Sequence, residues 1–180
     1  MATGDIFANY GTRDLFWGSG SPQAFTERMS GIVGGLPLGR TGLGTSTATT
    51  AGGDVYYCTL RIPVNGTPLP TGTTTQLIWT DDPGSPGATK VAVVGVSMAL
   101  ITSGTTDYNN ITWGTETATS LTAPSTATIV TMTGAAITKA NMGTPSAGNL
   151  VAVRIRRLPN NASDTHPGRL LLLGLSIQDT

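Results

Sequence analysis

The sequence predicts an all-β protein, an antiparallel jelly-roll-like β-sandwich with an extended N-terminal arm. Short segments rich in apolar and β-branched residues recur after residue 53, and turn residues such as Gly, Pro, Asn and Asp separate them. Charged residues make up only 11% of the chain, far below the usual share of about 25%, and threonine is abundant. No segment has a convincing helical period. We therefore assign residues 1–52 to the arm and residues 53–180 to the sandwich.

The clearest strand pattern lies in residues 149–180, where two apolar runs are joined by a polar loop. In the first run, valine and isoleucine alternate with Arg154 and Arg156, so that the arginines occupy the opposite face of an extended strand. We interpret the two runs as an antiparallel pair that forms the closing edge of the sandwich. In the second run, Leu170 and Leu172 fall on the face expected to be wet, so we predict an oligomer interface there. The core face of that strand is expected to carry Leu171, Leu173, Leu175 and Ile177.

Five further strands are expected between the arm and this pair, which together make a sandwich of seven strands, or eight with one from the arm. Turn signals such as Asn65-Gly66 separate them. A long connection over 134–148, with one helical turn, is expected to precede the final pair. The expected strands span 54–62, 74–80, 89–101, 108–113 and 126–133.

The arm is rich in glycine and has no run of apolar residues long enough for a core, yet it contains half of the aromatic residues of the chain. A disordered tail is typically poor in aromatics. We therefore expect the arm to become ordered on another protein, with an arm packed on its own sandwich as the alternative. The predicted contact residues are Phe7, Tyr10, Phe16, Trp17 and Phe25.

Charge and composition exclude several classes of partner. Ten acidic residues balance ten basic ones, and the one dense basic cluster, Arg154, Arg156 and Arg157, is interpreted as a solvated or ion-paired strand face. We therefore expect no nucleic-acid partner. No run approaches the roughly 20 apolar residues of a membrane helix, and the N-terminus lacks a signal-peptide pattern. The single cysteine, Cys58, excludes an intrachain disulfide and is expected to be a buried thiol, because it lies within an apolar strand pattern. These features predict assembly in a cytoplasm.

The titratable residues do not form a catalytic pattern. The only histidine, His166, lies in a polar loop and is expected to be a surface turn residue. Asp164 before Thr165 is interpreted as a turn whose carboxylate bonds nearby backbone N–H groups, or which pairs with Arg156 or Arg157. The pair Asp81 and Asp82 is interpreted as a turn rather than a calcium site. We expect no enzyme activity, no cofactor and no metal.

Four segments resemble tailed-bacteriophage virion proteins. An arginine-bearing strand over 150–157, the Asp164-Thr165 loop and a final apolar strand over 170–177 are similar to the C-terminal signature of that family. The segment 57–63, which ends at a proline, is similar to its first core strand. The resemblance covers residues 53–180 and implies a jelly-roll-like sandwich, commonly trimeric. The family includes capsid decoration proteins, head fibres and tail-associated proteins.

The resemblance implies a function in the virion. We expect a non-enzymatic decoration or cement protein, a homotrimer that binds the major capsid protein and stabilises the head. The alternative is a head- or tail-fibre or adaptor protein that binds a host receptor or glycan. In that case aromatic residues such as Trp79, Trp113 or Tyr108 would stack on sugars, whereas a place in the core is the competing interpretation for the three.

Overall fold

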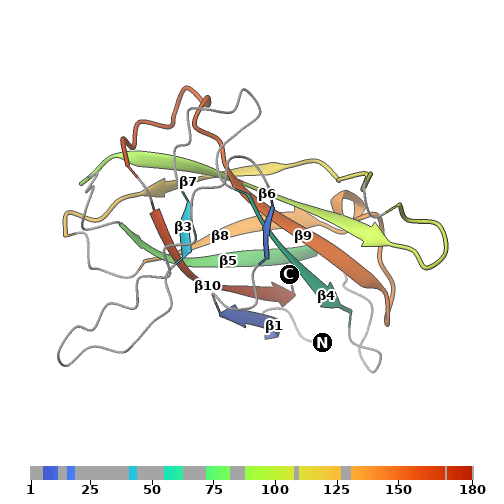
Figure 1. Ribbon diagram of the computed structural model, residues 1–180. Helices are drawn as coiled ribbons and strands as arrows, with labels where there is room; N and C mark the ends of the chain where they lie inside the picture. Colours follow the sequence, from blue (N-terminus) through green and yellow to red (C-terminus); the bar gives the residue numbers. More distant parts are fainter. Residues whose placement is uncertain are drawn as a thin grey trace.

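The chain folds into two antiparallel β-sheets of five strands that pack face to face, which confirms the predicted β-sandwich (Figure 1). The computed structural model describes residues 6–11, 16–18, 41–43, 55–62, 72–81, 88–107, 110–126, 131–168 and 170–179. In that part of the chain the only helical element is a 3-10 turn, η2 (Ala140–Met142). This turn lies within the connection where one helical turn was expected.

Sheet A is built around the last strand of the chain. Its order is β1-β10-β5-β8, and β3 pairs with β10 beyond the end of β1. The strands are β1 (Ile6–Gly11), β3 (Thr41–Leu43), β5 (Gly72–Asp81), β8 (Thr131–Thr138) and β10 (Leu170–Asp179).

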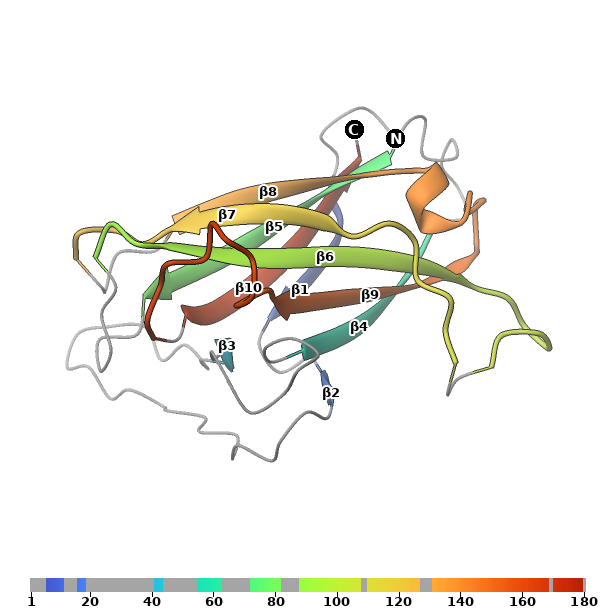
Figure 2. The ribbon, with the colours of Figure 1, turned by 90° about the horizontal axis from the view of Figure 1, so that it is seen from above.

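Sheet B has the order β2-β4-β9-β6-β7, which Figure 2 shows with β6 between β7 and β9. Its members are β2 (Phe16–Gly18), β4 (Val55–Arg61), β6 (Val91–Ile101), β7 (Thr117–Thr122) and β9 (Leu150–Arg157). Strands from early and late parts of the chain are interleaved in both sheets. A jelly-roll connectivity stays a prediction, and this interleaving is consistent with it.

Most expected strands are present, but two were misplaced. The long run expected over 89–101 is β6, and the runs expected over 54–62 and 74–80 are β4 and β5. The strand expected over 108–113 is wrong, because residues 111–113 are irregular and the strand in this part of the chain is β7, at 117–122. Of the strand expected over 126–133, residues 131–133 lie in β8, which continues into the predicted connection, while residues 127–130 lie outside the described part of the chain. Gly134, Ala135 and Ala136 lie in the middle of β8, and because they have little or no side chain, the period of two is not visible in the sequence.

The predicted pairing of the last two strands is wrong. β9 lies in sheet B between β4 and β6, whereas β10 lies in sheet A between β5 and the arm strands. Neither is therefore a closing edge. An amphipathic strand buries the same face whichever neighbour it has, so the alternation in the sequence cannot distinguish a hairpin from a crossover between sheets. The loop after Arg157 is long enough to make that crossover.

The predicted oligomer interface at Leu170 and Leu172 is also wrong, because both side chains are fully buried in the core of the protomer. The cause is a β-bulge in β10. Its register against β5 shifts between Leu172 and Gly174, so that one extra residue, Leu173, interrupts the alternation. Leu170 and Leu172 therefore face inwards together with Leu175 and Ile177, and Leu173 is only half-buried.

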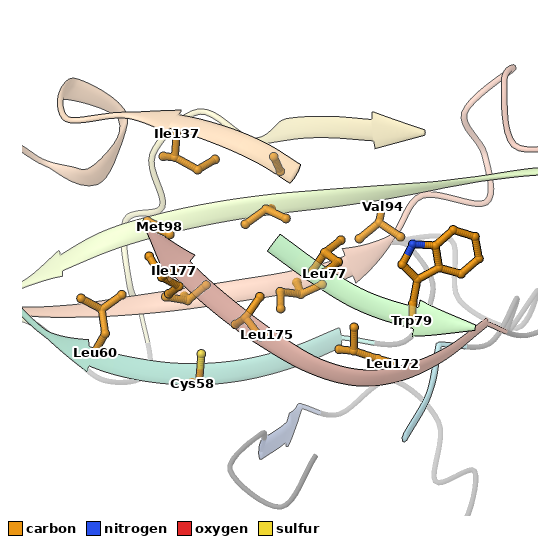
Figure 3. Close-up of a cluster of buried hydrophobic side chains, with 14 of the residues drawn as sticks. Cys58, Leu60, Leu77, Trp79, Val94, Met98, Ile137, Leu172, Leu175 and Ile177 are labelled. Atoms are coloured by element: carbon orange, nitrogen blue, oxygen red, sulfur yellow. The ribbon is translucent and has the colours of Figure 1, made fainter. Parts of the chain in front are cut away.

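The core fills the space between the sheets. Figure 3 shows side chains of β4, such as Leu60, and of β10, such as Leu175, among those that meet there. Trp79 is completely buried in this cluster, and its Nε1 donates a hydrogen bond to Thr133 Oγ1 (3.2 Å). Cys58 is buried as well. The expected core role of both residues is thus confirmed.

Three segments of the arm belong to the sheets. The backbone of β1 pairs with residues 174–178 of β10, and β3 pairs with residues 170–172 of the same strand. β2 pairs with residues 55–57 of β4. The side chains of the predicted contact residues Phe7, Tyr10, Phe16 and Trp17 lie outside the described part of the structure, as does all of Phe25. Their contact with another protein stays a prediction.

Candidate functional site

Two clusters of charged residues stand out in the described part of the chain. One lies beneath the closing loop, residues 158–168, which connects β9 to β10. It is centred on Arg157, the last residue of β9, which alternation places on the inner face of sheet B. The Arg157 guanidinium makes a bidentate ion pair with Asp164, from Nε to Oδ2 (2.9 Å) and from Nη2 to Oδ1 (2.7 Å). Neither side chain is more than 3% exposed.

Arg157 also holds the backbone of the closing loop. Its Nη1 donates to the carbonyl oxygen of Gly168, and its Nη2 donates to that of His166 (2.6 Å). A buried charge is tolerated only when it is paired and hydrogen-bonded, and this guanidinium is ion-paired and has a hydrogen-bond partner for each of its three nitrogens. The arginine therefore ties the loop to the end of β9.

Asp164 and Thr165 take the place of a strand beside β6. Pairing of β9 with β6 ends at Val94, so the backbone of Val91 and Val93 needs other partners on that side. The Asp164 carboxylate accepts the N–H of Val93 (3.0 Å), and Thr165 Oγ1 accepts the N–H of Val91 (3.1 Å). The N–H groups of Thr165 and Leu158 donate in return to the carbonyls of Val91 (2.7 Å) and Val93 (2.8 Å). The loop thus completes the edge of β6 that β9 leaves open.

The expected pairing of Asp164 with Arg157 is present, but its N–H partner is 71 residues away rather than in a local turn. The expectation that His166 is a surface residue is wrong. Its side chain is fully buried, with Nε2 3.0 Å from Asp81 Oδ1, and its Nδ1 accepts the N–H of Gly168 (3.1 Å). Asp81 is the last residue of β5 and faces the core, and Asp82 lies outside the described residues.

The second cluster lies on the outer face of sheet B. Glu116 precedes β7, and its carboxylate accepts two hydrogen bonds from Arg156, from Nε (2.6 Å) and from Nη2 (2.9 Å). The pair lies directly on the sheet because Gly95 of β6 has no side chain. A Cβ at that position would stand 2.5 Å from Glu116 Cδ. The close approach of the Glu116 side chain is therefore the reason for a glycine at position 95.

Arg154 lies two residues away on the same face and is stacked on an aromatic pair. Its Cζ is 4.7 Å from the centroid of the Trp113 ring, which is in turn 5.8 Å from the ring of Tyr57. Its Nε donates to Ser97 Oγ (3.0 Å). Its Nη2 is 3.7 Å from Glu116, too far for a good hydrogen bond.

The two arginines differ in their electrostatic environment. Burial and the neighbouring charge of Arg156 lower the pKa of Arg154 below its usual value. The hydrogen bonds that Arg156 donates to Glu116 raise the pKa of Arg156 instead. The Glu116 carboxylate is thus in close contact with Arg156 but not with Arg154. The positive charge of Arg154 is therefore the one that this carboxylate does not neutralise closely.

Sequence analysis had recognised a face with Arg154 and Arg156 but had wrongly grouped the buried Arg157 with them, and it had not found their partners. Glu116, Ser97 and Trp113 come from other strands and loops, and only the short Trp-Gly-Thr-Glu segment hinted that an aromatic and an acid lie together. Of the aromatic residues considered for sugar binding, Trp79 is in the core, Trp113 is half-buried on the surface, and Tyr108 lies outside the described residues.

The described residues offer neither a metal-binding group nor a membrane-spanning helix. No group of three or more His, Cys, Asp or Glu residues in that part of the chain is arranged to hold a metal ion. No helix there is long and apolar enough to cross a membrane.

Comparison with known proteins gives no family. No family model matches the chain, and no curated protein matches it. Among solved structures it is similar to an exo-β-1,3-galactanase from Phanerochaete chrysosporium, with a TM-score of 0.41 and 13% identity. The match covers 98% of this chain but only 29% of that enzyme's chain. A likeness of this size carries no argument about activity.

Proposed function

We propose that this chain is a structural protein of a tailed-phage virion, of the capsid decoration or cement type, that binds the major capsid protein and stabilises the head. The observation that carries the proposal is that residues from the segments similar to phage virion proteins are in contact with one another. Arg157, Asp164 and Thr165 form one buried unit that closes β6 and leads into the final strand. The residues that resemble the phage proteins are thus the ones that build this sandwich.

The engagement of the titratable residues supports a non-enzymatic role. His166 and Asp81 have fully buried side chains, and both ring nitrogens of the histidine are engaged in contacts. A general base has to reach the proton that it abstracts. This histidine would reach a substrate only if the closing loop opened. We therefore assign the cluster under the closing loop to stability.

In the proposed complex the arm makes the capsid contact through its aromatic residues. The backbone pairing of β1, β2 and β3 supports a modified mechanism, in which the arm is anchored on its own sandwich while the aromatics contact the partner. A homotrimer remains part of the proposal. Its interface has to lie elsewhere than Leu170 and Leu172, which are in the core.

The test uses purified protein and capsids that lack it, from the phage whose genome encodes the chain. We expect the protein to co-sediment with the capsids at hundreds of copies per particle and to raise their resistance to heat. Binding should weaken in a Phe25→Ala variant, whose midpoint of thermal unfolding is expected to stay that of the wild type. Deletion of the arm is a poor test, because it would strip β10 and β4 of their neighbours. The proposal would be contradicted if the protein were absent from particles, or if replacing the arm aromatics left capsid binding unchanged.

The alternative, a fibre or adaptor protein that binds a host glycan, keeps one structural observation in its favour. Trp113 is half-buried on the surface beside Arg154 and Tyr57, residue types that sugar-binding surfaces also use, although Arg154 covers one face of its ring. A few copies per virion, together with a glycan-array signal that Trp113→Ala removes, would favour this function over decoration.

A further inference from the structure

We propose that Arg154 and Trp113, on the outer face of sheet B, form a binding site for a carboxylate that a partner protein supplies from an aspartate or glutamate side chain. The residues of this site belong to the sandwich and not to the arm. The inference rests on the proposed function only in taking a protein as the partner.

The charge balance on this face points to a missing carboxylate. Among the described residues, two guanidinium groups, those of Arg154 and Arg156, face one carboxylate, that of Glu116. That carboxylate gives its short contacts to Arg156 and stays 3.7 Å from Arg154. Within the described part of the chain, the only hydrogen bond that Arg154 donates is the one from Nε to Ser97. Its Nη1 and Nη2 groups therefore have donors to offer.

The guanidinium of Arg154 is held in a fixed orientation in which it can bind an anion. Ser97 fixes one end of the plane, and the Trp113 ring, packed against Tyr57, supports its face. A fixed planar fork matches the two oxygens of a carboxylate and loses little conformational entropy on binding. The side chain is 19% exposed, so an anion can reach it, while partial burial strengthens the interaction.

The surroundings favour a protein over a sugar as the source of the carboxylate. A pyranose stacks on an open aromatic face, but Arg154 covers one face of Trp113 and the Tyr57 ring lies against the same indole. Tryptophan, tyrosine and arginine are the residues that dominate protein–protein binding energies.

The first experiment measures carboxylate binding by isothermal titration calorimetry, with poly-L-glutamate as the probe and hyaluronate as the sugar carboxylate. We expect the affinity for poly-L-glutamate to fall about tenfold in Arg154→Met, which keeps the packing of the stem but removes the fork. Arg61→Met is the matched control. Arg61 is the last residue of β4 and is exposed on the same outer face of sheet B, and its loss changes the net charge equally. Thermal melts of both variants show whether they are folded.

Three outcomes would overturn the inference: equal losses in the two variants, no binding of poly-L-glutamate by the folded wild type, or Arg154-dependent binding of hyaluronate in preference to poly-L-glutamate. A second experiment separates this inference from the proposed function, by capsid co-sedimentation of the Arg154→Met variant. We expect at least part of the binding to be lost. Equal binding of wild type and variant would refute the inference alone. If the wild type binds no capsids while its glutamate site behaves as described, the proposed function fails and the site stands.

Discussion

Replacing Arg157 by methionine tests whether the closing loop is held by its buried ion pair. The change keeps most of the side-chain volume but removes the bidentate contact to Asp164 and the two donors to loop carbonyls. Asp164 would keep the N–H of Val93 and remain buried as a carboxylate without a cation. Breaking one partner out of a buried pair costs about 3–5 kcal/mol, which for a chain of this length corresponds to a fall of about 6–20 °C in the melting temperature.

The assay is urea denaturation followed by circular dichroism, with Arg156→Met as the control. Arg156 pairs with Glu116 on the surface, so its loss should cost only about 0.2–1 kcal/mol. The double variant Arg157→Met/Asp164→Asn removes both charges, and its cost should be about 1–3 kcal/mol smaller than the sum of the two single changes. Equal costs for the Arg157 and Arg156 variants, or strict additivity in the double variant, would refute the reasoning.

Three further predictions concern the core, the loop and the outer face. Leu172→Ala should lower the free energy of unfolding by about 2–5 kcal/mol at any protein concentration, whereas Leu173→Ala, at a half-buried position, should lower it clearly less. If the destabilisation by Leu172→Ala vanished on dilution, Leu172 would instead lie in an oligomer interface. His166→Phe leaves the buried N–H of Gly168 without its acceptor and should cost about 1–3 kcal/mol in urea melts, so a cost near zero would show that the loop is held without the histidine. Gly95→Ala should displace the flexible Glu116 side chain and cost about 0.2–1 kcal/mol, like Glu116→Gln, and a crystal structure of the variant with the Glu116–Arg156 contact intact would contradict this.

The inner and outer faces of β9 were predictable because they follow from the chain alone. Successive side chains of a strand point to opposite faces, so Val153 and Ile155 enter the core while Arg154 and Arg156 stay outside. Among the candidate sites, the same rule predicted the arginine face. It could not predict what lies on that face, because Glu116 and Trp113 arrive from a loop whose path depends on close packing at Gly114, where a Cβ would overlap the carbonyl oxygen of Asn141.

The last strand shows where the local rule ends. Four consecutive leucines, 170–173, hide the alternation, and the inward set changes at Leu173 because the bulge is defined by the register against β5. The same holds for Asp164 and His166, which looked like residues of a polar surface turn. Their partners, Val93 and Asp81, are 71 and 85 residues away along the chain.

By itself, the sequence determined that this protein is a β-sandwich, and it determined which residues of an unbroken strand such as β9 are buried, since both follow from alternation and turn composition. Only the tertiary structure decided that the final strands separate into different sheets, that Leu170 and Leu172 lie inside the protomer, and that Arg157, Asp164 and His166 meet beneath one loop. The reason is physical. Alternation is a property of one strand, whereas register, bulges and the pairing of buried charges depend on which distant segment lies beside it.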